Sequence, residues 1–305
     1  MKVISFLKTI RHEPFLSEKK ANILRSFVNG VINCGDDGIV SSSDEHLPCD
    51  VGVILGYSIP RKLPHHLAFR VNIVEEQSKN GNHTVIVDSN LFGFAKNADE
   101  LGYHRFSLDD VFPTTGNYFE DLVDPDRLKS IQRDTNLKLK DWRSKGDHIL
   151  VCCQRPNGWS MRDLDTYHWV AKVMRTLKKH TDRRIVIRVH PHCGQKSILA
   201  EQFRNLGHEV SDKETLVEDL VNAHALVIFN SSPGVVSAIE GIPTFVTDPI
   251  SRNSQAFEVA NFDLSQIENP VFPDRQKWLE KIAMCHWKLS ELENGDAWDF
   301  IKNCV

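Results

Sequence analysis

The chain has 305 residues, of which 41% are hydrophobic and 26% charged, the proportions of an ordinary globular protein with room for about two domains. Its net charge of −4 gives no overall attraction for nucleic acid, and no apolar run reaches the roughly 18–20 residues that a membrane-spanning helix needs. The seven cysteines are an odd number without a Cys-x-x-Cys pair, which favours reduced thiols in a cytoplasm over a disulfide framework or a zinc site.

In the first part of the chain, apolar runs typical of buried strands alternate with helical patterns. The expected strands are residues 1–8, 31–33, 50–57, 84–87 and 105–108, and the expected helices are 17–29 and 66–79. Gly30 is expected just past the end of the first helix. Apolar strands that alternate with helices indicate a parallel sheet covered on both faces. Residues 1–112 are therefore predicted to form one doubly wound, Rossmann-like α/β domain.

Residues 113–147 are predicted to be a linker that contains one helix from Asp126 to about Lys145. Between Arg127 and Lys145 the chain carries seven basic and two acidic residues, the only strongly basic stretch in the sequence. Two interpretations stay open, a solvated linker helix and a contact with a phosphate backbone.

Residues 148–274 show the same alternating pattern and are predicted to form a second Rossmann-like domain. The expected strands are 148–153, 184–189, 209–210, 225–229 and 244–247, and the expected helices are 163–180, 194–206, 215–222 and 234–240. Residues 275–305 are expected to hold a last amphipathic helix over 275–294 that packs back across the domain boundary. The predicted fold class is α/β, with two doubly wound domains facing a cleft.

Polar clusters follow two of the strands in the second domain. Arg188 and His190 follow one strand, and Ser231 and Ser232 follow another, with a helix beginning near Gly234. The carboxyl ends of parallel strands open onto one crevice, so both clusters are expected to meet there. Hydroxyls and the free N–H groups of a helix N-terminus favour a phosphate. His190 as a strand cap and the serine pair as a simple helix cap are the structural alternatives.

The loop from Gln154 to Met161 joins a strand to a helix and contains Gly158. Such loops cradle phosphates or bases in α/β proteins, so Gln154 and Gly158 are predicted to bind the same ligand. One glycine is a weak signal when taken alone.

Two α/β domains with a phosphate seat in the second suit a group-transfer enzyme that uses a nucleotide-linked donor, so residues 1–112 are expected to bind the acceptor and residues 148–274 the donor. His190 is expected to donate a hydrogen bond or a proton to the leaving phosphate. The acceptor hydroxyl needs a base, and carboxylates in the first domain are the candidates. Asp36 and Asp37 lie between two glycines and are expected to project from a strand end, with Asp88 as the second choice. A solvated turn without a chemical role is the alternative for the Asp36–Asp37 pair.

The second half resembles the carboxyl-terminal half of GT-B glycosyltransferases, in the style of capsule and lipopolysaccharide Kdo-transferases and bacterial sialyltransferases. The resemblance covers about residues 148–250. The residues that carry it are Arg188-Val189-His190-Pro191, Asn230-Ser231-Ser232-Pro233-Gly234 and Ala238-Ile239-Glu240-Gly241-Ile242-Pro243-Thr244.

The resemblance implies that His190 contacts the nucleotide phosphate and that Ser231 and Ser232 supply phosphate-binding hydroxyls. It also implies a metal-independent, inverting transfer from a nucleotide-sugar co-substrate, with no further cofactor. Asp36-Asp37-Gly38 is similar to the acidic pair before a glycine that supplies the base in the sialyltransferases, although its position in the chain differs.

The predicted acceptor is a hydroxylated or hydroxymethylated cytosine in phage DNA, because size and layout resemble the phage DNA glycosyltransferases. The basic helix with Arg61, Lys62 and Arg70 would line a groove for that DNA, in the host cytoplasm. A capsular polysaccharide or lipopolysaccharide acceptor, a nucleotide-sugar epimerase and a non-catalytic nucleotide-sugar-binding module are the alternatives. The oligomeric state is not predicted.

Overall fold

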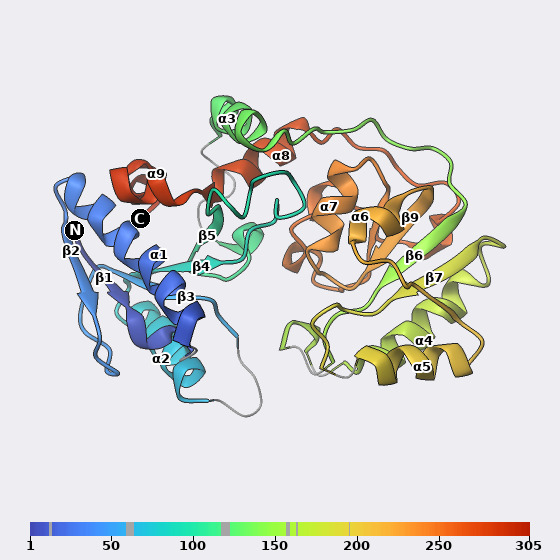
Figure 1. Cartoon of the computed structure of the whole chain (residues 1–305), viewed down its shortest axis with the longest axis horizontal. Coiled ribbons are helices and arrows are strands. Elements are labelled where there is room, and N and C mark those ends of the chain that lie inside the picture. The colour runs from blue at the N-terminus through green and yellow to red at the C-terminus, as the bar shows by residue number, and fades with distance from the viewer. Residues whose placement is uncertain (12–13, 59–63, 117–122, 157–158, 163, 195) are drawn as a thin grey trace. The chain divides into compact units, whose positions relative to one another are not determined.

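The computed structural model describes residues 1–11, 14–58, 64–116, 123–156, 159–162, 164–194 and 196–305. The chain divides into two compact units, each with its own β-sheet (Figure 1). The first unit combines residues 1–136 with residues 279–305, and the second comprises residues 137–278. The boundaries predicted from the sequence lie at 112/113, 147/148 and 274/275, so the predicted linker is divided between the two units.

The first unit has a six-stranded sheet in the order β11-β5-β4-β3-β1-β2. Strands β1 to β4 are parallel, whereas β5 runs antiparallel to β4, and β11 antiparallel to β5. Its strands are β1 (Lys2–Phe6), β2 (Asp37–Ser41), β3 (Val51–Leu55), β4 (His83–Asp88), β5 (His104–Leu108) and β11 (His286–Trp287). Its helices are α1 (Pro14–Asn33), α2 (His65–Lys79), α3 (Pro125–Thr135), α9 (Leu289–Asn294) and α10 (Asp296–Ile301), with short 3-10 helices η1 (Leu7–Thr9), η2 (Pro113–Thr115) and η7 (Lys302–Cys304).

The predicted strand at Val31–Asn33 is wrong, because α1 continues through these residues to Asn33. Gly30 does not end the helix either. A Cβ at Gly30 would lie 2.0 Å from the carbonyl oxygen of Leu292 and 3.0 Å from Cα of Gly295, so the glycine allows the C-terminal segment to approach α1 closely. The strand that follows α1 is β2, which begins at Asp37.

The second unit has a five-stranded, fully parallel sheet in the order β10-β9-β6-β7-β8. Its strands are β6 (His148–Cys152), β7 (Arg184–Arg188), β8 (Glu209–Val210), β9 (Ala223–Ile228) and β10 (Thr244–Val246). Its helices are α4 (Thr166–Leu177), α5 (Lys196–Asn205), α6 (Leu216–Leu220) and α7 (Pro233–Ile239), with short 3-10 helices η3 (Trp159–Met161), η4 (Ser251–Asn253), η5 (Phe257–Val259) and η6 (Leu264–Gln266). Strands β6 and β9 are buried along their whole length, as expected for a parallel sheet covered on both faces.

The predicted basic helix over residues 126–145 is wrong beyond Thr135. Asn136 adopts the left-handed conformation (φ 55°) and ends α3. The next residues bond to the end of α7 instead of to one another. The amides of Lys140 and Arg143 donate to the carbonyls of Ile239 and Gly241 at 3.0 and 2.7 Å. These two amides therefore bond to the last residue of α7 and to the turn after it, and not to carbonyls of their own segment.

The predicted helix over 275–294 is broken in two. Helix α8 (Gln276–Met284) contains the boundary between the units, β11 follows it, and α9 begins at Leu289. Trp287 belongs to β11, which pairs with β5 as the outermost strand of the first sheet.

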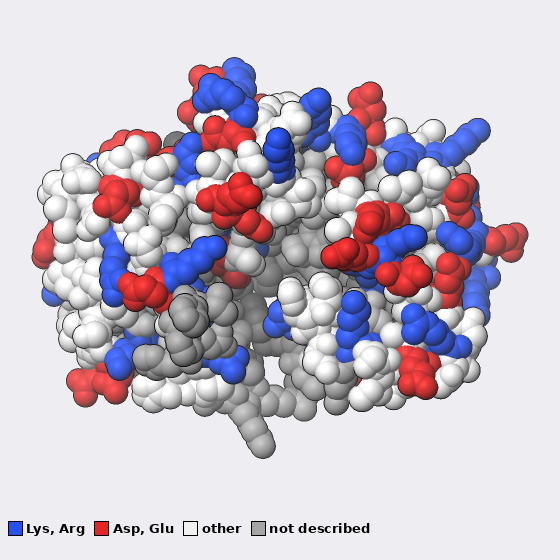
Figure 2. Space-filling view, viewed as in Figure 1, with Lys and Arg blue, Asp and Glu red and all other residues white. Residues whose placement is uncertain are grey.

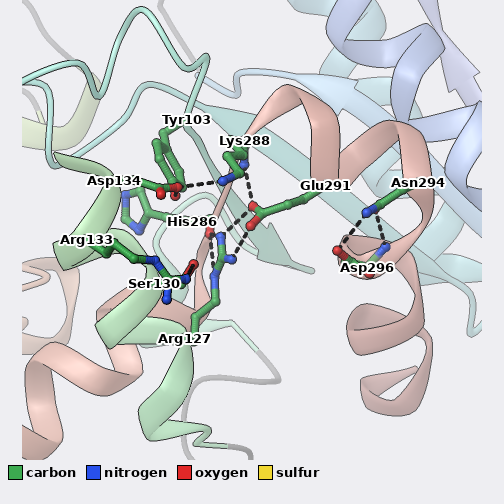
Figure 3. A network of polar contacts seen from close by, with 10 residues as sticks. All are labelled: Tyr103, Arg127, Ser130, Arg133, Asp134, His286, Lys288, Glu291, Asn294 and Asp296. Atoms are coloured by element: carbon green, nitrogen blue, oxygen red, sulfur yellow. Dashed lines mark hydrogen bonds and ion pairs between the residues drawn. The ribbon is translucent and has the colours of Figure 1, made fainter.

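A buried ion pair ties this C-terminal segment to α3 within the first unit (Figure 3). The Arg127 guanidinium donates to both carboxylate oxygens of Glu291, at 2.6 and 2.8 Å, and lies 4.1 Å from the ring centroid of Trp287. Lys288 reaches Asp134 at 2.5 Å, and the Asp134 carboxylate also accepts from the Tyr103 hydroxyl. The most basic part of the sequence therefore has a structural role at Arg127.

No helix in the described part of the chain combines the length and the apolar character required to span a membrane.

Candidate functional site

The polar site of the second unit lies where its strand order reverses. Counted in chain order from β6, the sheet has the order 3-2-1-4-5, so the reversal falls between β6 and β9. Open α/β sheets bind ligands at the carboxyl ends of the strands beside such a switch point. Gln154 and Asn230 stand two residues beyond the ends of β6 and β9, which places both loops at this point.

Gln154 and Asn230 are buried and bond to one another across the switch point. The Asn230 amide donates to Oε1 of Gln154 at 3.1 Å, and Nε2 of Gln154 donates to Oγ of Ser160 at 2.9 Å. The Asn230 side chain donates to the Ser160 carbonyl at 3.1 Å and to Oδ2 of Asp248 at 2.7 Å. Gln154 therefore fixes the two loops to each other, which is a positioning role.

Asp248 follows β10 and is the buried acceptor of this cluster. Its fully buried side chain accepts hydrogen bonds from Asn230, from the Ile250 amide at 2.8 Å and from Arg162, with which it forms an ion pair. Arg162 itself has φ +48°, a conformation that non-glycine residues rarely adopt and that clusters at functional sites. The Asp248 ion pair is one of the contacts that accompany this strained backbone.

The two predicted hydroxyls stand directly beside this cluster. Ser231 Oγ is buried and has no hydrogen-bond partner among the described residues. A buried hydroxyl left unpaired costs roughly 1–3 kcal/mol, so such groups in native proteins call for an explanation. Ser232 is exposed, and its side chain makes no cap hydrogen bond to α7. Capping of α7 therefore does not account for either hydroxyl.

The phosphate contact predicted at Gly234 relied on free N–H groups at the start of α7, and these groups are not free. The Gly234 amide donates to the Ser231 carbonyl at 3.1 Å, and the Val235 amide to the Ser232 carbonyl at 2.9 Å. A Cβ at Gly234 would lie 2.6 Å from Cδ1 of Ile228, so the glycine faces the interior and allows α7 to pack on the sheet. The first amides of α7 are thus not free for a ligand.

His190 stands two residues beyond β7, with its imidazole in a defined tautomer. Its Nδ1 accepts from the His192 amide at 3.1 Å, so the neutral ring carries its proton on Nε2. Nε2 has no partner among the described residues. Burial, with a contribution from the charge of Arg155, lowers the pKa of His190 to about 4. His190 is therefore a neutral hydrogen-bond donor near pH 7, which favours donation of a hydrogen bond over donation of a proton to a leaving phosphate.

His190 and Ser231 follow β7 and β9, the two strands that flank β6. Strands are about 4.8 Å apart, so these residues lie roughly two strand spacings from one another. The predicted convergence on a single anion is therefore possible only for a group lying over the end of β6. The exposed Arg155 stands there, one residue after Gln154.

The Arg188 guanidinium is bonded to the protein through Nη1 and Nη2, which favours a structural role over the ligand contact predicted for it. It forms a buried ion pair with Asp219 and donates to the carbonyls of Lys213 and Glu214, at 3.1 and 2.9 Å. These bonds attach the segment before α6 to the end of β7. Arg188 is a structural residue.

The placement predicted for Asp36 and Asp37 is also wrong. Asp36 precedes β2 and Asp37 is the first residue of that strand, opposite Lys2, the first residue of β1. Both residues are thus at the amino edge of a parallel sheet, whereas ligands bind at the carboxyl edge. Hydrogen bonds from the Met1 amino group and from Trp298 keep the pKa of Asp36 below its ordinary value. Asp36 links the amino terminus to α10.

Asp88 ends β4 and so lies at the carboxyl edge of the first sheet, as expected. Its carboxylate accepts from Nη2 of Arg105 at 2.7 Å and from the Ser89 amide at 2.7 Å. Gly158, Arg61 and Lys62 lie outside the residues that the structure describes.

Sequence reasoning missed four residues of the second-unit site: Arg155, Ser160, Arg162 and Asp248. Asp248 was detectable by the rule that identified Ser231 and Ser232, since Thr247-Asp248-Pro249 also follows a buried strand. Arg162 was not, because its backbone strain and its pairing with Asp248 exist only in the folded chain. A pocket of 310 Å³ adjoins Arg162 and is lined by Trp169, Phe229 and Thr247, among others.

Within the described ranges, no group of three or more His, Cys, Asp or Glu side chains is arranged to hold a metal ion.

A scan of protein-family models and a search of curated proteins each gave no match. The fold is similar to solved structures of KpsC from Thermosulfurimonas dismutans. The beta Kdo 2,4 transferase shares 12% identity with a TM-score of 0.57, covering 100% of this chain and 98% of that chain. The beta Kdo 2,7 transferase shares 12% identity with a TM-score of 0.50, covering 96% of this chain and 99% of that chain.

These likenesses show the fold: the chain has two Rossmann-like domains of the GT-B type. A UDP-GlcNAc 2-epimerase of Methanocaldococcus jannaschii, complexed with UDP-GlcNAc and UDP, also matches, with 10% identity. It covers 100% of both chains, but its TM-score of 0.36 is too low to support an argument.

Proposed function

We propose that this protein is a glycosyltransferase that binds a nucleotide sugar in its second unit and transfers the sugar to a saccharide hydroxyl. The observation that carries the proposal is the buried, unpaired hydroxyl of Ser231 at the β6–β9 switch point. A ligand that accepts a hydrogen bond from this hydroxyl removes the cost of leaving it unpaired.

The charges at this edge suit the phosphates of a nucleotide. Arg155 provides a positive charge over the end of β6, and His190 provides a neutral N–H donor on Nε2. Groups aimed at the leaving phosphate stabilise the negative charge that develops as the glycosidic bond to the donor breaks. The pocket lined by Trp169 and Phe229 is assigned to the nucleotide base, because aromatic and apolar walls suit a planar ring.

A saccharide acceptor is preferred over hydroxymethylated DNA. The basic helix proposed for DNA does not exist beyond Thr135, and Arg127 is buried against Glu291. Lys140 pairs with Glu240, and Arg143 donates to the carbonyls of Leu220 and Ala223. Figure 2 shows basic and acidic side chains interspersed on the face that it displays. The KpsC structures that share the fold are transferases of a sugar, Kdo, which is consistent with the same choice.

The base for the acceptor hydroxyl is assigned to Asp88 in the first unit. It is the carboxylate at the carboxyl end of β4. Ser89 donates to its Oδ1 and Arg105 to its Oδ2, which leaves a lone pair on Oδ2 for a hydroxyl proton. Metal-independent transfer with inversion remains a prediction.

The test is to incubate the purified chain with CMP-, UDP- and GDP-sugars and to detect product by mass, using saccharides or hydroxymethylated DNA as acceptors. Ser231→Ala is expected to weaken binding of the donor about tenfold, since hydrogen bonds to charged groups contribute roughly 1.5–3 kcal/mol. Ser237→Ala is the matched control, because this buried serine of α7 already bonds to the Ile242 carbonyl. Glycosylated DNA as the sole product, or donor binding indifferent to Ser231→Ala, would contradict the proposal.

A further inference from the structure

The first unit has a switch point of its own. Its first five strands have the order 2-1-3-4-5, so the strand order reverses between β1 and β3. Thr9 is fully buried and spans this point: its hydroxyl donates to the Phe6 carbonyl at 2.6 Å and accepts from the Leu55 amide at 3.3 Å. The ends of both strands are thus fixed by one side chain.

Arg70 of α2 is attached to this same residue. Its Nε donates to the Thr9 carbonyl at 2.7 Å. The terminal nitrogens Nη1 and Nη2 have no hydrogen-bond partner within the described ranges. Such a fork donates two parallel hydrogen bonds to a carboxylate or a phosphate.

The backbone next to the guanidinium keeps this fork uncovered. Gly56 follows β3 with φ +72°, and a Cβ there would lie 3.0 Å from Nη1 of Arg70. Any other residue would therefore place a side chain against the nitrogen that a ligand must reach, in a strained conformation.

The charges around Arg70 leave it without a close counter-ion among the described residues. Asp88 is the carboxylate that acts on it through space, but Asp88 is already bonded to Arg105. Burial lowers the pKa of Arg70 to about 10, so it stays charged at neutral pH while being partly removed from water. His66, one helical turn earlier, has its pKa lowered by burial and by the charges of Arg70 and Arg11. The electrostatic field at this edge therefore favours an anion.

We propose that Arg70, beside the carboxyl ends of β1 and β3, binds a carboxylate or phosphate group through its terminal nitrogens. The assignment of this anion to the acceptor rests on the proposed function. The acceptor is then an acidic saccharide whose reacting hydroxyl lies toward Asp88. The Nε bond to Thr9 fixes the plane of the guanidinium and so the direction from which the anion approaches.

Binding is tested on the full chain without a donor. Glucuronate and inorganic phosphate are titrated while amide shifts of Gly56 and Thr9 are followed by NMR, with glucose as the neutral control. Either anion is expected to shift these amides and glucose is not. Arg70→Met should weaken binding at least tenfold, while Lys79→Met, which removes a charge from the exposed end of the same helix, should leave it unchanged. Arg70→Lys keeps the positive charge but not the forked guanidinium, so its affinity for the anion should lie between those of Arg70→Met and Lys79→Met.

Turnover distinguishes this proposal from the proposed function. Uronic-acid and phosphorylated oligosaccharides are compared with a neutral one as acceptors, and release of nucleotide without acceptor is measured in parallel. Arg70→Met should raise KM for the acidic acceptor at least tenfold without changing acceptor-free release. Two results would overturn the Arg70 site and leave the transferase intact. The first is release of nucleotide from the donor without any preference for acidic acceptors. The second is equal binding of single-stranded DNA by Arg70→Met and the unaltered chain, together with no shift of the Gly56 and Thr9 amides on addition of either anion. Anion binding at Gly56 in a chain that binds no nucleotide sugar supports the site and refutes the transferase.

Discussion

His190 shows how the folded environment changes the chemistry that a residue type suggests. The ring donates from Nε2 because Nδ1 accepts from His192, and its pKa of about 4 keeps it neutral over the physiological range. Because the folded pKa lies below the unfolded value near 6.5, the neutral ring stabilises the fold above pH 6.5, and that stabilisation is lost as the pH falls toward 4.

The pH dependence of the donor's kcat/KM is therefore expected to show no inflection near pH 6.5 that depends on His190. His190→Gln retains an N–H donor and should lower kcat/KM less than His190→Ala, for which a loss of about tenfold to a hundredfold is expected. An inflection between pH 6 and 7 that disappears in His190→Gln would instead identify a general acid.

Arg188 is expected to affect stability and not ligand binding. Removing one partner of a buried ion pair leaves the other charge unpaired and typically costs about 3–5 kcal/mol. Arg188→Met should therefore accelerate hydrogen exchange of second-unit amides, and nucleotide binding by the folded fraction should not change. Arg184→Met is the control, because Arg184 lies on β7 with Arg188 but forms an exposed pair with Glu209 of β8, and such pairs contribute about 0–1 kcal/mol. Exchange rates that are equal in the two variants would exclude the structural role.

Comparing two variants shows which carboxylate of the first unit is the general base. Asp88→Asn should lower kcat by about a hundredfold or more if Asp88 is the base, because general base catalysis contributes typically 10²–10⁴-fold. Asp37→Asn should leave kcat unchanged, since Asp37 lies at the amino edge of the sheet. The reverse result would restore the Asp36–Asp37 pair as the base and remove Asp88.

Among the secondary-structure elements, local patterns predicted most strands and failed where a distant segment decides the structure. The buried runs of β3, β4, β6 and β9 are apolar enough to be identified from the sequence. The sequence predicts that Gly30 ends a helix. In the fold Gly30 instead makes room for Leu292 and Gly295, which approach it from the far end of the chain. Neither neighbour is visible in a local window.

Helix α3 and the C-terminal segment make a prediction about coupling. Arg127→Met and Glu291→Leu should each destabilise the first unit by about 3–5 kcal/mol, because each leaves a buried charge unpaired. The double variant should be less destabilised than the sum of the two, since it removes both charges. Lys129→Met is the control on the same helix, where the pair with Asp126 is exposed. Urea unfolding followed by hydrogen exchange of β5 amides measures the effect, and strict additivity would show that the two charges do not interact.

For the molecule as a whole, the sequence predicted the class of fold and the edge of the second sheet where the polar residues gather. The rule about carboxyl ends of parallel strands placed Ser231, Ser232 and His190 correctly at that edge. The same rule failed for Asp36 and Asp37, because the preceding residues form a helix and not a strand. The rule depends on strand direction, which a short β-branched run does not settle. Contacts such as those of Arg188 with Asp219 and of Arg162 with Asp248 depend on packing between segments far apart in sequence.

The division into units predicts that the two can be separated by a truncation. Ending the chain after Met284 removes β11, α9 and α10, and with them Trp298, whose ring packs against Phe27, and Glu291, the partner of Arg127. The first unit should then lose protection from hydrogen exchange throughout β1 to β5, because these residues complete its core. The second unit contains none of them and should keep both its protected amides and its affinity for nucleotide.

The control is a fragment of residues 137–284, which should bind nucleotide as the truncated chain does. Loss of nucleotide binding in the fragment would show that the donor site requires the first unit. If β1 to β5 stay protected from hydrogen exchange in the truncated chain, the C-terminal segment is dispensable for the first sheet.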